Sequence, residues 1–102
     1  MAQHPLSGTL PPAGVSIEVA AGLLRDGSTV WGHLRFDRDG LRFRPQGAGG
    51  YVRMALDEID GLRWAPTGVL EVDGRGRSHA WTGDGVRRIH GALQLAFGAA
   101  AA

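Results

Sequence analysis

Basic side chains and one tyrosine recur at alternate positions near the middle of this 102-residue chain. They are His33, Arg35, Arg42, Arg44, Tyr51 and Arg53. Alternate residues of an extended strand point to the same face, and residues directly opposite each other on antiparallel strands lie ~5 Å apart. Guanidinium groups gathered in this way can bind phosphate, a carboxylate-rich peptide or a nucleic-acid backbone. We take the six residues as a candidate ligand or partner patch.

A solvated sheet face explains the same residues without any ligand. The chain has nearby acidic residues that can balance the arginines, namely Asp37, Asp39, Asp57 and Glu58. Ion pairs on a protein surface contribute only ~0–1 kcal/mol each, and arginines on exposed strands are common. The solvated face is the simpler interpretation, and the binding patch stays open as the other.

A β-hairpin over residues 32–43 is predicted to position His33, Arg35 and Arg42, with Arg44 directly after it. The residues that alternate with them are apolar: Leu34, Phe36, Leu41 and Phe43. Between the two runs, Asp39-Gly40 accepts positive φ and reverses the chain. The hairpin therefore has an apolar inner face and a cationic outer face.

Similar alternation predicts seven short strands, over residues 15–24, 29–36, 41–44, 51–56, 61–65, 69–73 and 77–81. Gly32 is expected to mark a bend or bulge in the second strand. Ile59, inside the polar turn 57–60, is expected to fill part of the core. After Trp81 the period changes, because Val86, Ile89, Leu93 and Phe97 share one helical face.

Thr82 or Asp84 is expected to cap this C-terminal helix, whose apolar stripe can close the open end of a folded sheet. The predicted fold class is mainly β with one C-terminal α-helix. Its architecture is a seven-stranded, partly open barrel or sandwich capped by the helix.

Residues 32–36 (Gly-His-Leu-Arg-Phe) and 40–43 (Gly-Leu-Arg-Phe), followed by residues 52–56 and Asp57-Glu-Ile, resemble GRAM and PH-like domains. The order of Gly32 to Phe36, Glu58-Ile59, Trp64 and Trp81-Thr82-Gly83 is similar to the N-terminal PH-like domain of the FACT histone chaperone small subunit (structure-specific recognition protein). The resemblance covers residues 22–95. It implies a PH-like fold, an interaction module and, by analogy, association with chromatin.

The chain is predicted to contain one domain. Residues 1–14 read as a flexible lead-in, residues 15–97 as the PH-like domain and residues 98–102 as a disordered tail. The net charge is +1, cysteine is absent, and no apolar run reaches the length of a membrane span. We expect a soluble intracellular protein, either cytoplasmic or nuclear.

No catalytic constellation is recognisable, so the sequence predicts no enzyme, cofactor or metal site. The four histidines are scattered without metal-ligand spacing, and neither a Gly-x-Ser-x-Gly nor a phosphate-loop motif occurs. A polar turn explains Asp57, Glu58 and Asp60. Trp64 and Trp81 are expected to pack against the helix and Trp31 to be exposed. One exposed tryptophan is not a stacking platform, so nucleic acid is not expected as a direct ligand.

The predicted function is a non-catalytic interaction module that binds a protein partner, with exposed strand edges and the groove beside the helix as docking places. The alternative is a peripheral membrane or phosphoinositide-binding GRAM-like adaptor, in which Arg42, Arg44 and Arg53 meet an anionic lipid head group. Arg42-Phe43-Arg44 resembles the Arg-x-Arg of lipid-binding PH domains but lies on the third predicted strand. The loop 25–28 is short and holds one arginine, which argues against a phosphate cradle there.

Overall fold

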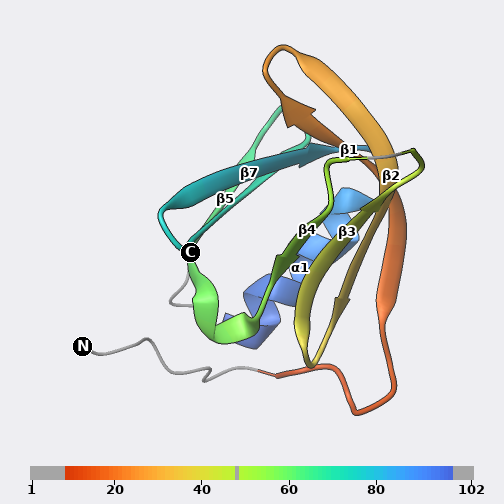
Figure 1. Cartoon of the computed structure of the whole chain (residues 1–102). Helices are drawn as coiled ribbons and strands as arrows, with labels where there is room; N and C mark the ends of the chain where they lie inside the picture. The colour runs from red at the N-terminus through yellow and green to blue at the C-terminus, as the bar shows by residue number, and fades with distance from the viewer. Residues whose placement is uncertain (1–8, 48, 98–102) are drawn as a thin grey trace.

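The computed structural model describes residues 9–47 and 49–97, over which seven strands and a C-terminal helix form in the predicted order (Figure 1). The strands are β1 (Ile17–Arg25), β2 (Ser28–Asp37), β3 (Gly40–Pro45), β4 (Val52–Met54), β5 (Ile59–Ala65), β6 (Val69–Gly74) and β7 (Arg77–Thr82). A short 3-10 helix, η1 (Leu56–Glu58), joins β4 to β5, and α1 (Val86–Phe97) follows β7. The predicted fold class is confirmed.

The strands form one antiparallel sheet in the order β4-β3-β2-β1-β7-β6-β5. β1 pairs with β2 along its whole length, but with β7 only over residues 22–24. β1 therefore joins two halves of the sheet that diverge from each other. Figure 1 shows β2–β4 and β5–β7 on opposite sides of an opening in which α1 lies. β4 and β5 are the two edges of the sheet, so the barrel is partly open.

The core lies between the inner faces of the two halves and α1. The predicted helical stripe is confirmed, since Val86, Ile89 and Leu93 are fully buried, and Phe97 packs partly buried against the core. Trp81 is the largest fully buried side chain, with its ring centroid 6.2 Å from that of Phe43. Burying a large aromatic or aliphatic side chain contributes roughly 1.5–3 kcal/mol, so this stripe holds the helix in place.

The start of α1 differs from the sequence-based expectation. Within the described residues, backbone bonds hold the first turn: the Val86 N–H donates to the Gly83 carbonyl over 3.1 Å, and the Arg88 N–H donates to the Gly85 carbonyl over 3.1 Å. The side chains of Thr82 and Asp84 therefore do not act as the predicted caps. The glycine-rich approach lets main-chain turns replace them.

β2 has no bulge at Gly32, although a bulge is one of the two possibilities that the sequence predicts for this residue. The register of β2 passes through this residue without a shift, with Ala21 opposite it on β1 and Pro45 on β3. Glycine is needed there because a Cβ atom would overlap the carbonyl oxygen of Arg44 and lie 2.6 Å from the Cα of Pro45. The irregularity lies instead in β5, just after Ile59, which is buried as expected.

Part of the predicted lead-in contacts the domain. The Thr9 N–H donates to the carbonyl of Leu95 over 2.7 Å, and Leu10 packs partly buried against the core. These contacts tie residues 9–10 to the end of α1. Residues 1–8 of the lead-in and the predicted tail 98–102 lie outside the described residues.

Candidate functional site

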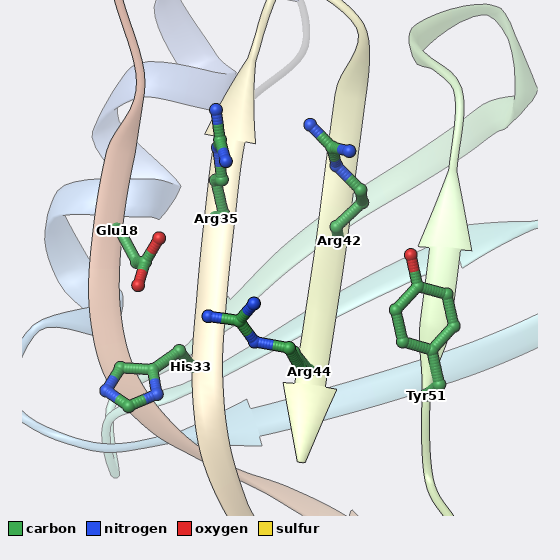
Figure 2. A pocket seen from close by; sticks show the side chains of 6 residues that line it. All are labelled: Glu18, His33, Arg35, Arg42, Arg44 and Tyr51. Atoms are coloured by element: carbon green, nitrogen blue, oxygen red, sulfur yellow. The ribbon is translucent and has the colours of Figure 1, made fainter. Parts of the chain in front are cut away.

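The predicted patch lies on the outer face of β2, β3 and β4, opposite the core. Cross-strand register places His33 against Arg44, Arg35 against Arg42, and Arg42 against Arg53. Figure 2 shows five of the six predicted residues, joined by Glu18 from β1, around one hollow of 110 Å³. Arg53 lies beside Arg42 but does not line this hollow. The local hairpin thus brings the residues together as the spacing predicts.

Two of the arginines share one carboxylate within the patch. Asp37 accepts a hydrogen bond from Nη2 of Arg42 over 3.1 Å, and its Oδ2 lies 3.3 Å from Nε of Arg35. Asp37 is almost buried and also accepts the Asp39 N–H over 2.8 Å. Of the four carboxylates expected to balance the patch, Asp37 is the one that pairs with it in the described part of the chain.

Arg44 and Arg53 have no carboxylate partner within residues 9–47 and 49–97. His33 lies opposite Arg44, and Arg42 lies opposite Arg53, so that like charges face each other in the second pair. Such pairs destabilise a sheet. The outer face of β2–β4 therefore keeps an uncompensated positive field around these two arginines.

Two exposed aromatic side chains flank the arginines. Trp31 on β2 is 53% exposed and Tyr51 before β4 is 57% exposed, which confirms the expectation for Trp31. The indole of Trp31 lies over β1, because a Cβ on Gly22 would lie 3.1 Å from its ring. Hereafter the arginine–aromatic face denotes the predicted patch together with Trp31.

A second cationic cluster converges at the open end of the barrel. Arg25, Arg53, Arg75, Arg77 and His79 line a hollow of 460 Å³ between β4 and the β6–β7 turn. Its lining contains no carboxylate, although Glu58 lies 3.3 Å from Arg75.

The sequence pattern did not reveal this cluster because its members come from distant strands. The available signal was the Gly74-Arg75-Gly76-Arg77 turn, together with the arginine that ends β1. Only the pairing of β1 with β7 brings Arg25 to this turn.

The two histidines near the core are poor proton acceptors. Burial lowers the pKa of His79, and the charges of Arg25 and Arg77 lower it further. Burial and the charge of Arg87 lower the pKa of His90. Both rings are therefore neutral at neutral pH. The ring of His90 stacks on Trp64 at 5.0 Å, which confirms the expected packing of that tryptophan against the helix.

The outer face of β5–β7 carries a network of hydrogen bonds between charged side chains. Arg63 donates to Glu71 over 2.7 Å and to Asp73 over 2.8 and 3.1 Å. These hydrogen bonds raise the pKa of Arg63, with Glu71 contributing most. The Ser78 hydroxyl donates to Asp73 over 2.5 Å, which is the main cause of that carboxyl's lowered pKa. The central charges of this face, Arg63, Glu71 and Asp73, are thus paired with one another, unlike Arg44 and Arg53 on β2–β4.

The described residues hold no group of three His, Cys, Asp or Glu side chains placed to bind a metal ion. None of the helices in the described part of the chain is long and apolar enough to cross a membrane.

No protein-family model and no curated protein matches the chain. Its architecture is similar to the solution structure of the N-terminal PH domain of human ARAP2, with a TM-score of 0.60 over 85% of this chain and 86% of that one. The chain has a PH-like fold. Since the two sequences are only 16% identical, the similarity concerns the fold alone. The ligand has to be inferred from the residues of the site. The finer resemblance to the FACT small subunit stays a prediction.

Proposed function

We propose that this PH-like chain is a non-catalytic interaction module that binds a protein partner through the arginine–aromatic face. The observation that carries the proposal is the joint exposure of Trp31 and Tyr51 beside the unpaired Arg44 and Arg53. Tryptophan, tyrosine and arginine are the residue types most enriched at interface hot spots. Aromatic residues and arginine are also enriched in protein–protein interfaces relative to the rest of the surface.

The charge pattern of the face favours a protein over a membrane. Glu18 lines the same hollow as the arginines, and Asp37 pairs with two of them. An anionic bilayer would be repelled by these carboxylates, whereas a protein can place charges of both signs opposite them. Membrane binding by Arg42, Arg44 and Arg53 is the alternative outcome of the test.

The experiment compares partner capture by the chain and by two variants. Trp31→Ala with Arg44→Glu alters the face, and Trp31 and Arg44 are exposed enough for the fold to survive. Arg87→Glu, on the exposed side of α1, changes the charge by the same amount elsewhere. A partner identified by cross-linking should bind the purified chain and the helix variant, and should lose at least about tenfold in affinity for the face variant.

Sedimentation with phosphatidylcholine vesicles containing phosphatidylserine tests the membrane alternative. Salt-sensitive vesicle binding that the face variant loses, without any captured protein, would favour that alternative. Equal capture by the face variant and the unaltered chain would refute the proposal. Size-exclusion chromatography with light scattering shows whether the partner is a second copy.

A further inference from the structure

We propose that the groove along the free edge of β4 binds an extended acidic peptide, which adds to β4 as a further antiparallel or parallel strand. We call this hollow of 460 Å³ the edge groove. It is a second binding site that shares Tyr51 and Arg53 with the arginine–aromatic face but is formed mainly by other residues.

The backbone of β4 forms one wall of the edge groove. Four consecutive residues, 51–54, line it, although alternate side chains of a strand point to opposite faces. The hollow therefore runs along the strand's edge. Among the described strands, β4 is the last of the sheet and pairs with β3 alone (Figure 1). An edge strand leaves alternate N–H and C=O groups free to pair with another chain.

The opposite wall is cationic. It contains Arg75 and Arg77 from the β6–β7 turn, with His79 deeper in β7, while Arg25 lines the groove from the end of β1. Arg75 has Glu58 as a partner at 3.3 Å, whereas Arg25 and Arg77 have no carboxylate partner in the described residues. Burial lowers the pKa of His79, and the charges of Arg25 and Arg77 lower it further, as expected for a ring that faces these two arginines.

The two walls together select an acidic peptide. Main-chain pairing with β4 supplies affinity for an extended backbone, and the arginines supply charge-assisted hydrogen bonds to carboxylates. Val52 and Met54 add an apolar strip. A strand paired with the three residues of β4 spans roughly 10 Å, and its alternate side chains stand roughly 7 Å apart. A segment that alternates acidic and aliphatic residues fits this spacing.

The edge groove is closed at the C-terminal end of β4, which limits how many residues a peptide can pair with. The Ala55 N–H, just after β4, is already taken by Glu58 Oε1 over 2.9 Å. Gly74 lies so close to the strand that a Cβ there would be 2.8 Å from Sδ of Met54. The peptide therefore pairs with residues 51–54 and leaves the groove past Tyr51.

The test measures fluorescence anisotropy of the labelled peptide Asp-Val-Glu-Val-Asp-Val-Glu with the full chain. Two further peptides keep the sequence but carry N-methyl groups on one or the other alternate set of backbone amides. Because strand addition requires backbone donors, one of the two methylated peptides should bind at least about tenfold more weakly.

The matched variants are Arg25→Glu with Arg77→Glu in the groove, and Arg87→Glu with Arg88→Glu on the outside of α1. Both pairs change the net charge equally. The groove pair should weaken binding by about tenfold or more, and the helix pair by less than about twofold. Circular dichroism checks that each variant is folded.

Three results would overturn the proposal: no binding of the peptide by the unaltered chain at millimolar concentration, equal binding of all three peptides, or equal effects of the two variant pairs. Displacement of the peptide by a few millimolar inorganic phosphate, or tighter binding to phosphatidylserine vesicles than to the peptide, would assign the arginines to a phosphate or a membrane instead. Arg44→Glu lies outside the groove and should leave peptide binding unchanged, which separates this site from the arginine–aromatic face.

Discussion

Replacing Gly32 with alanine should destabilise the domain, although alanine is normally more favourable in a strand than glycine is. The new Cβ would meet the carbonyl oxygen of Arg44 and the Cα of Pro45, and both are backbone atoms of β3 that cannot rotate away. Overpacking costs about 1–3 kcal/mol, and a clash with backbone atoms belongs at the upper end of this range, at about 3 kcal/mol. The lower entropy of the unfolded chain offsets only about 0.5–1 kcal/mol of this. We expect a net loss of about 2 kcal/mol.

Gly47→Ala is the matched control, because a Cβ at Gly47 would meet nothing within 4 Å and its φ lies outside the left-handed region. Urea denaturation should show Gly47→Ala equal to or slightly more stable than the unaltered chain. For a domain of this size, a loss of about 2 kcal/mol lowers Tm by roughly 8–16 °C. Equal stability of the two variants would show that β2 and β3 do not approach as closely as the structure indicates.

Three further predictions concern the helix, the patch and pH. Gly91→Ala should stabilise by about 1 kcal/mol in denaturation, since Gly91 lies inside α1 and a Cβ there meets nothing within 4 Å. Asp37→Ala should cost about 1–3 kcal/mol by the same assay, because it removes the acceptor of the Arg42 guanidinium and of a backbone N–H. Burial lowers the pKa of both His79 and His90 from 6.5, so the unfolded chain binds more protons and stability should fall as pH drops through about 6.5 and below. The double variant His79→Asn with His90→Gln should flatten this loss between pH 7.5 and 5.5; an unchanged slope would contradict the assignment.

The fold and the arginine–aromatic face were predictable because both depend on local pairing. The turn at Asp39-Gly40 sets the register of β2 against β3, and this register alone aligns Arg35 with Arg42. The helical stripe is likewise local. Alternation of side chains thus determined which face each residue occupies.

The edge groove and the role of Gly32 were not predictable because they depend on non-local approach. Arg25 and Arg77 are more than half of the chain apart in sequence. They line the same groove only because β1 pairs with β7. A glycine inside a strand is compatible either with a bulge or with a close neighbour. Only the position of the Arg44 carbonyl decides between them.

The contrast in charge pairing between the two halves of the sheet leads to a last prediction. On β5–β7 the cross-strand neighbour of Arg63 is Glu71, whereas on β2–β4 the neighbour of Arg53 is Arg42. A pair of like charges in direct opposition is unfavourable by ~0.2–1 kcal/mol. Arg53→Glu should therefore raise the free energy of unfolding at low salt, and Arg53→Gln should raise it less.

Comparison of Arg53→Glu with Arg53→Gln separates the effect of the charge from the effect of losing the arginine side chain. High salt should reduce the gain, because exposed charges are screened. The same Arg53→Glu change should weaken the binding of both the protein partner and the acidic peptide. Arg53 belongs to the arginine–aromatic face and also lines the edge groove. A more stable variant with weaker binding would mean that Arg53 serves ligand binding at a cost in stability. An unaltered chain more stable than both variants would mean that Arg53 serves the fold, and that its opposition to Arg42 is compensated by contacts of the arginine stem.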